Sequence, residues 1–218
     1  MARVRLAAIE FVATAFLLIA VVGSGIMAER LADGNVALAL LANAIATGGA
    51  LVALILAFGP ASGAHMNPVV TLAAVVLDSF DRRLAVAYAA AQIAGAIAGV
   101  WLTHLMFTLP VLELGSKSRT GAGQWLGEAI ATFGLLATIW GCRAQRAPVT
   151  AIAVAAYITG AYWFTSSTSF ANPAVTVARA LTDTFAGIRP QDAPEFIVAE
   201  LAGFAAALPL LKTLVKDD

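Results

Sequence analysis

Six apolar segments, each close to the length of a membrane crossing, constrain this chain more than any other feature. They are Ala7–Met27, Val36–Phe58, Leu84–Phe107, Trp125–Cys142, Pro148–Phe164 and Phe196–Val215. A helix needs about 20 mostly apolar residues to cross roughly 30 Å of hydrocarbon. Inside lipid, every backbone N–H and C=O must find a partner within the protein, and an isolated helix achieves this. The chain is therefore predicted to be an all-α membrane protein with six transmembrane helices.

The composition supports this class and argues against others. The chain is 61% hydrophobic and 12% charged, whereas soluble domains carry about 25% charged residues. Its formal net charge is zero, and it has no basic tail, which argues against nucleic acid as a partner. A cleaved signal peptide is the alternative reading of Ala7–Met27, but that segment is too long and contains Glu10. With the N-terminus inside, eight Lys and Arg residues face the cytoplasm and five face outward, which predicts that both termini are cytoplasmic.

The two halves of the chain repeat one pattern. In "IEFVATAF" and in "GEAIATFG" a glutamate, Glu10 or Glu128, opens a span and is followed four residues later by threonine. Each half then reaches an Asn-Pro pair, at Asn67 in the first and at Asn172 in the second. Three spans per repeat is an odd number, so the second copy must enter the membrane from the opposite side. This is an inverted-topology repeat.

The repeats cover about 1–107 and 120–215 and are joined by a polar loop, so residues 1–218 are predicted to form one channel domain. Asn is a favoured helix N-cap and Pro is favoured at the first helical position, so each Asn-Pro pair predicts a helix start. The apolar stretches 67–77 and 172–181 are about ten residues long, or roughly 15 Å of helix. An ordinary capped helix explains one such motif. Two copies at matching places predict half-helices that meet near the membrane midplane.

Several segments together resemble the aquaporin and glycerol-facilitator family. "SGAHMNPVVTLA" matches its first Asn-Pro-Ala box, with Val69 in place of Ala, and "FANPAVTVA" matches its second. "EFVATAFL" and "EAIATFGLL" match its first and fourth helix openings, and "YAAAQIAGAIAG" its third helix. The resemblance covers nearly the whole chain. It implies an hourglass fold of six transmembrane helices and two half-helices, a pore within each protomer, and a homotetramer in the bilayer. Among bacterial members it implies the inner membrane.

The boxes have a physical consequence for the solutes that could pass. A helix N-terminus carries a partial positive charge of about +0.5, so two that point at the midplane oppose cations. Asn67 and Asn172 would each project an amide N–H donor into the pore. A ladder of backbone carbonyl acceptors is predicted from Gly63, Ala64, His65, Ser169, Phe170 and Ala171. Such a lining favours small neutral solutes that form hydrogen bonds.

The resemblance also implies an outer selectivity filter, at Thr47, Gly160, Ser169 and Val175. The family's filter arginine falls at Val175, and where water channels carry a bulky aromatic and a histidine this chain has Thr47 and Gly160. All four residues are small or medium-sized and uncharged, so a wide filter is expected. The pattern is most similar to bacterial aquaglyceroporins associated with arsenic resistance. Water, glycerol-like polyols, arsenous acid and methylated arsenicals are the implied solutes.

Arg179 leaves two interpretations open. It lies four residues after Val175, hence on the same helical face one turn outward. Its charge would then stand in for the missing arginine, or its side chain would extend to the membrane interface, which is the interpretation favoured from sequence.

The remaining polar residues are predicted to support the backbone near the Asn-Pro pairs and not to catalyse a reaction. Glu10 and Glu128 are expected to accept hydrogen bonds from the backbone that precedes each Asn-Pro pair. Two distant histidines and the single Cys142 predict no metal site and no cofactor, and the absence of catalytic motifs argues against an enzyme. A coupled secondary transporter and a structural membrane protein are the alternative functions.

Overall fold

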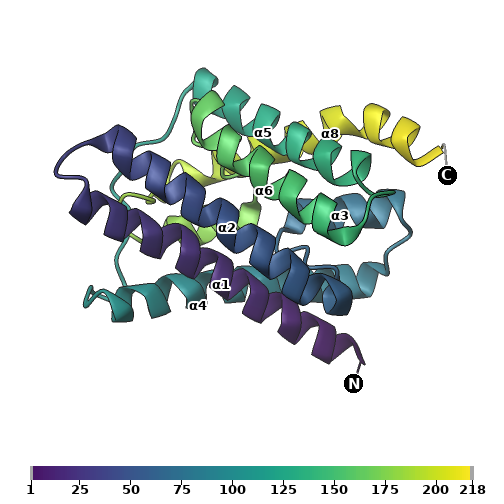
Figure 1. The fold of residues 1–218 in the computed structure, drawn as a ribbon, viewed down its shortest axis with the longest axis horizontal. Helices are drawn as coiled ribbons and strands as arrows, with labels where there is room; N and C mark the ends of the chain where they lie inside the picture. The colour runs from purple at the N-terminus through teal and green to yellow at the C-terminus, as the bar shows by residue number, and fades with distance from the viewer. Residues whose placement is uncertain (1, 217–218) are drawn as a thin grey trace.

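Eight helices make up the described part of the chain, residues 2–216 of the computed structural model (Figure 1). They are α1 (Ala2–Leu31), α2 (Val36–Ser62), α3 (Pro68–Leu77), α4 (Arg82–Met106), α5 (Ala122–Gly141), α6 (Ala147–Phe164), α7 (Pro173–Arg179) and α8 (Ala193–Lys216). No strand occurs among these residues. Six helices are long and two, α3 and α7, are short, which is the predicted all-α class. The predicted domain 1–218 includes residues 1, 217 and 218, which lie outside the described part.

The six long helices match the six predicted membrane spans, although α4 and α5 each end one residue before the predicted span does. Five of them, all except α5, are long and apolar enough to cross a membrane. α5 spans 20 residues but carries Gln124 and Glu128, two polar side chains that lower its mean hydropathy. Glu128 is fully buried, so its carboxylate faces the protein interior and not the lipid.

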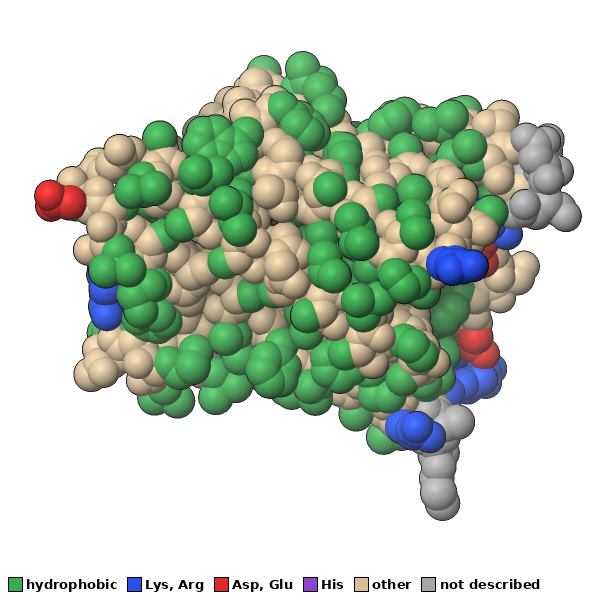
Figure 2. Space-filling view, in the orientation of Figure 1, with side chains coloured by type: hydrophobic (Ala, Val, Ile, Leu, Met, Phe, Trp, Pro, Cys, Tyr) green, Lys and Arg blue, Asp and Glu red, His purple; other side chains and the backbone are tan. Residues whose placement is uncertain are grey.

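The surface has the distribution of side chains that a membrane requires. Figure 2 shows hydrophobic side chains covering the broad middle of the visible face, while charged side chains gather at the two ends of the long axis. The long helices run along this axis in Figure 1. Exposed large apolar side chains include Phe16, Ile45, Val86 and Ile152. This is the surface of a multi-pass membrane protein.

The helices pack as two matching sets. α1 packs mainly on α4 and α2, α5 mainly on α8 and α6, and α2 contacts α6 between the two sets. Glycines allow the closest approaches. A Cβ atom added to Gly95 or Gly99 of α4 would lie 2.2 Å or 2.3 Å from a backbone carbonyl oxygen of α1. One added to Gly203 of α8 would lie 2.3 Å from the carbonyl oxygen of Ala129 on α5. Small residues let the backbones touch, as is typical of membrane helix pairs.

Gly99→Ala is expected to destabilise the protein by about 1–3 kcal/mol, because the added methyl group meets backbone that cannot move aside. The matched control is Gly49→Ala, since no atom lies within 4 Å of a Cβ added to that exposed helical glycine. Thermal unfolding in detergent measures both variants. A Gly99→Ala protein as stable as the Gly49→Ala protein would contradict the close α1–α4 packing.

The two short helices begin where the sequence predicts. α3 starts at Pro68 and α7 at Pro173, each with the preceding asparagine as N-cap in an extended conformation. α3 ends at the predicted Leu77, but α7 ends at Arg179, two residues before the predicted end, so its expected length was wrong.

Loop contacts explain why α7 stops early. The carbonyl of Arg179 accepts from the Ile188 N–H at 3.1 Å, and that of Ala180 accepts from the Gly115 N–H at 3.0 Å. Segments before and after the helix in sequence thus satisfy its last carbonyls. Another helical turn would lose these two bonds.

Candidate solute pathway

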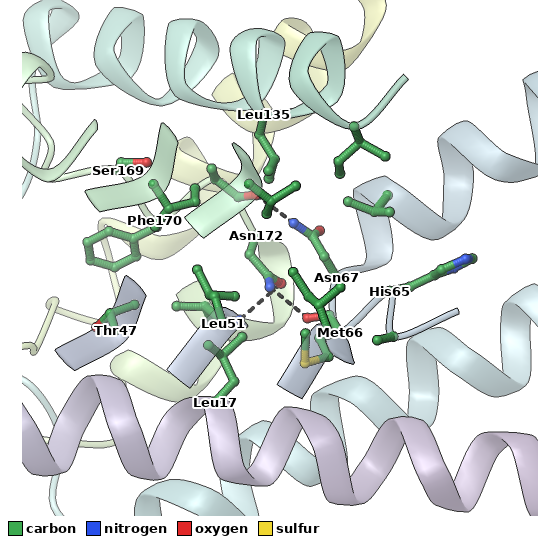
Figure 3. Close-up of a pocket in the computed structure, with 18 of the residues that line it drawn as sticks. Leu17, Thr47, Leu51, His65, Met66, Asn67, Leu135, Ser169, Phe170 and Asn172 are labelled. Carbon is green, nitrogen blue, oxygen red and sulfur yellow. Dashed lines mark hydrogen bonds between the residues drawn. The ribbon is translucent and has the colours of Figure 1, made fainter. Parts of the chain in front are cut away.

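Hydrogen bonds from the two asparagines join the two pore loops, residues 63–67 before α3 and residues 165–172 before α7. Nδ2 of Asn67 donates to the carbonyl oxygen of Ala171 at 2.7 Å, and Nδ2 of Asn172 donates to that of Met66 at 2.7 Å. Figure 3 draws both bonds. Each Oδ1 atom accepts from backbone amides of its own half-helix, so the amide orientation is fixed. An amide nitrogen has two N–H donors, and the second one of each asparagine is left for a solute.

The first pore loop is held by Glu10 of α1. Its Oε1 accepts from the His65 N–H at 3.0 Å and its Oε2 from the Met66 N–H at 2.7 Å. Ser62 and Gln92 donate their side-chain groups to the same carboxylate. Glu10 is fully buried, and four donors satisfy it. The carboxylate therefore fixes the backbone that carries Asn67.

The second pore loop is held by two carboxylates. Glu128 accepts from the N–H groups of Phe170 and Ala171 at 2.8 and 2.7 Å. Glu200 of α8 accepts from the next amide, Asn172, at 3.0 Å and from the Thr176 hydroxyl at 2.7 Å. Sequence reasoning did not assign a role to Glu200. Its signal was available: a carboxylate in a membrane span needs donors.

These carboxylates hold a strained backbone. Ala64 and Met66 in the first loop have φ of 46° and 48°, and Ser169 and Ala171 in the second have φ of 53° and 50°. Such left-handed conformations cost non-glycine residues on the order of 1–3 kcal/mol and persist only where surrounding contacts determine them. The glutamate bonds supply those contacts in both loops.

A cavity of about 370 Å³ runs along the two loops. In Figure 3, Thr47, Ser169 and Phe170 lie on one side of the asparagine pair and His65 on the other. All six residues expected to form the carbonyl ladder line this cavity: Gly63, Ala64, His65, Ser169, Phe170 and Ala171. The carbonyl of Ala171 already accepts from Asn67. Met66, which sequence reasoning omitted, has the matching role toward Asn172.

Three of the four expected filter residues lie in the cavity wall, and the fourth does not. Thr47, Ser169 and Val175 line it. Gly160 does not: a Cβ added there would meet the ring of Phe164 at 3.4 Å, and that ring is largely exposed.

α6 lines the cavity with two other residues, Ile158 and Tyr162. They are one helical turn apart, and Gly160 lies roughly 200° around the helix from each. The Tyr162 hydroxyl lies 3.3 Å from Oγ1 of Thr47. On the α6 side the cavity is therefore lined by an aromatic side chain, Tyr162, and not by Gly160.

Arg179 does not extend to the membrane interface. It is 2% exposed and lines the cavity. Its guanidinium carbon lies 3.4 Å from the centre of the Phe170 ring, and its Nε donates to the carbonyl of Ala186. The interpretation favoured from sequence is thus corrected.

Arg119 is a second buried arginine, in the polar loop that joins the two repeats. It is 6% exposed, and its nitrogens donate to the carbonyl oxygens of Gly187 and Ser167 at 2.9 and 3.1 Å. Burial lowers the pKa of Arg119 to about 10, so the side chain keeps its charge at neutral pH. The loop between the repeats therefore folds onto the second pore loop. No sequence periodicity signals such a contact.

The opposite end of the cavity is lined by His65 and by an ion pair. Nδ1 of His65 lies 3.1 Å from Oγ1 of Thr71, and its ring packs against Phe80 and Tyr88. Asp78 and Arg143, 3.5 Å apart, also line the cavity. Within residues 2–216, no group of three or more His, Cys, Asp or Glu side chains is arranged to hold a metal ion.

Comparison with known proteins gives consistent matches. The model of the family described as major intrinsic protein matches residues 1–162. The chain is 54% identical to aquaglyceroporin AqpS of Rhizobium meliloti over 208 residues, which is 95% of this chain and 88% of that protein. It is 34% identical to the probable aquaporin AqpM of Archaeoglobus fulgidus, over 77% and 74% of the two chains. The structure of the aquaglyceroporin from Plasmodium falciparum superposes with a TM-score of 0.74 over 98% of this chain and 96% of that one; at 22% identity this likeness concerns the fold.

Proposed function

Because the chain belongs to the major intrinsic protein family, we propose that it is a passive transmembrane channel for small neutral solutes. Water, glycerol-like polyols, arsenous acid and methylated arsenicals are the proposed solutes. The name of its relative, an aquaglyceroporin, supports the polyols. The chain acts as a channel and not as an enzyme in this proposal.

The reciprocal bonding of Asn67 and Asn172 is the observation that carries the proposal. Each amide donates one hydrogen to the opposite loop, which leaves one donor per asparagine at the same point of the cavity. A single solute oxygen has two lone pairs and can accept from both. Because these groups are neutral, the site offers hydrogen bonds from uncharged donors, and the three glutamates that hold the loops are not among the residues that line the cavity.

The outer filter is proposed to consist of Thr47, Tyr162, Ser169 and Val175. Thr47 and Ser169 supply hydroxyl groups, and the Ser169 Oγ has no hydrogen-bond partner within residues 2–216. Val175 presents only methyl groups where an arginine would narrow the pore. A solute that bears methyl groups loses no hydrogen bond against such a wall, which supports methylated arsenicals as solutes.

The proposed arrangement in the cell follows from the same family. We propose a homotetramer in the inner membrane of a bacterium, with a pathway in each protomer and both termini in the cytoplasm. The inverted repeats, about 1–107 and 120–215, form one channel domain. The matched packing of α1 on α4 and of α5 on α8 supports the repeat.

A panel of permeabilities tests the proposed solutes. Purified protein in vesicles is exposed to gradients of water, glycerol, arsenous acid and a methylated arsenical, and swelling is followed by stopped flow. Faster entry than in empty vesicles is expected for all four solutes. Entry of water alone would contradict the open filter, and no accelerated entry would favour a structural membrane protein.

Mercurial reagents are expected to leave flux unchanged in the unmodified protein. Its single thiol, Cys142, is not among the residues that line the cavity. Ser169→Cys places a thiol in the cavity wall and should make glycerol flux sensitive to micromolar mercurial, with recovery after added thiol. Block of the unmodified protein that disappears in Cys142→Ala would contradict this position of the pathway.

A further inference from the structure

The guanidinium of Arg179 is a charged group in the cavity wall. It ends α7, is 2% exposed, and lines the cavity on the Phe170 side of the asparagine pair. Its hydrogen bond to the Ala186 carbonyl uses Nε. Within residues 2–216 its two terminal nitrogens have no hydrogen-bond partner, and the side chain forms no ion pair.

The neighbouring arginine differs in this respect. Arg119 also lies near the Phe170 ring, with its guanidinium carbon 5.1 Å from the ring centre. However, Arg119 donates to loop carbonyls through both Nε and a terminal nitrogen, and it is not among the residues that line the cavity. Arg119 therefore fastens the outer loop. Of these two arginines, it is Arg179 that both lies in the cavity wall and has terminal nitrogens that donate to no atom of residues 2–216.

The nearest buried carboxylates do not cancel this charge by contact. Both oxygens of Glu128 accept from backbone amides, and Oε1 of Glu200 accepts from Asn172 and Thr176. A buried charge without an ion partner is costly unless it is hydrated or bound to a ligand. The Phe170 ring face offsets part of this cost. The cavity side of the guanidinium is the part that water or a solute can satisfy.

We propose that Arg179 is a specificity-determining residue of the pathway and binds oxygen-rich solutes before they reach the asparagine pair. This rests on the proposed channel function. Its two terminal N–H groups bind two oxygens of one small neutral polyol or oxyacid, while the Phe170 ring supports the guanidinium from behind. Its charge excludes cations.

The geometry of the Arg179 side chain supports its proposed role in binding solute oxygens. A guanidinium presents a planar, two-pronged donor set that suits two oxygens on the same or adjacent atoms, whereas an ammonium is a point charge. Val175 lies one helical turn before Arg179 on the same face and also lines the cavity. A solute therefore passes from a charged donor to an apolar surface, and then to the neutral donors of Asn67 and Asn172.

Two substitutions separate the hydrogen bonds from the charge. Arg179→Lys keeps the charge and is expected to lower the glycerol-to-water permeability ratio by about tenfold, the effect of one lost charge-assisted hydrogen bond. Arg179→Leu removes both and is expected to lower the ratio at least as much and to open a potassium conductance. Arg189→Leu is the control, because Arg189 is a partly exposed arginine paired with Asp192 outside the cavity lining. It should change neither quantity.

Water flux through each variant in vesicles reports whether the pathway is folded. With water flux intact, an unchanged glycerol-to-water ratio and no potassium current in Arg179→Leu would overturn the inference. Should Arg179→Leu fail to fold, Arg179→Lys decides: a tenfold lower ratio supports the inference and an unchanged ratio overturns it. Failure of the proposed function is distinguishable, because the unmodified protein would then not accelerate glycerol entry.

Discussion

Asn172→Asp is expected to cut glycerol flux by at least tenfold and to admit cations. An aspartate can still accept from the N–H groups of Ala174 and Val175, so the helix cap persists. The donor that faces Met66 across 2.7 Å becomes an oxygen that repels the Met66 carbonyl. The variant also loses the donor proposed to bind the solute. In addition, its negative charge cancels the positive potential of two opposed helix N-termini.

Solute flux and ion current, measured together in vesicles, test this prediction. Asn35→Asp is the matched control, because Asn35 is an exposed N-cap whose side chain accepts from Leu38 far from the cavity. If Arg179 is a second barrier in series, the cation current should increase further when Arg179→Leu is combined with Asn172→Asp. Unchanged glycerol flux without a cation current in Asn172→Asp would contradict the midplane site.

Val175→Arg is expected to reduce the flux of glycerol and of methylated arsenicals by at least tenfold, and that of water much less. Val175 is 5% exposed and lines the cavity. An arginine there adds bulk and a second positive charge one turn from Arg179. Large solutes lose the space, whereas a water molecule can still pass and accept from the guanidinium.

Val175→Met separates the effect of added side-chain volume from the effect of added charge at this position. It should reduce the flux of large solutes only slightly, because a flexible uncharged side chain can lie along the wall. The permeability panel for water, glycerol and a methylated arsenical measures both variants. Intact large-solute flux in Val175→Arg would contradict a filter at this level of the pathway.

Local signals predicted the framework of the fold. Apolar length located all six long helices, and the Asn-Pro pairs located the starts of α3 and α7. These features depend on neighbouring residues along the chain, through hydrophobic length and helix capping.

Contacts between distant segments explain what the sequence did not predict. α7 is short because the Gly115 and Ile188 amides satisfy its last carbonyls. Counting back from Asn172 selected Gly160, yet the rotation of α6 presents Ile158 and Tyr162 to the cavity. A spacing taken from related proteins locates a position along a helix, but it does not fix which face of the helix points inward.

The two buried arginines illustrate the same limit. Arg119 lies in a polar loop and Arg179 at a helix end, and both positions favour an exposed side chain by local rules alone. In the structure, the outer loops fold over the second pore loop and supply the carbonyls of Gly187 and Ala186 as acceptors. The burial of Arg119 depends on a contact with Gly187, which lies 68 residues later in the chain. The burial of Arg179 depends on a contact with Ala186, seven residues later.

Glycerol entry with and without ion gradients tests the central proposal most directly. The unmodified protein in vesicles should accelerate glycerol entry equally when sodium and proton gradients are present, reversed or absent, and the rate should increase linearly with the glycerol gradient. Accelerated entry that requires an ion gradient, or that saturates with glycerol and carries ions along with it, would contradict a passive channel and indicate a coupled transporter.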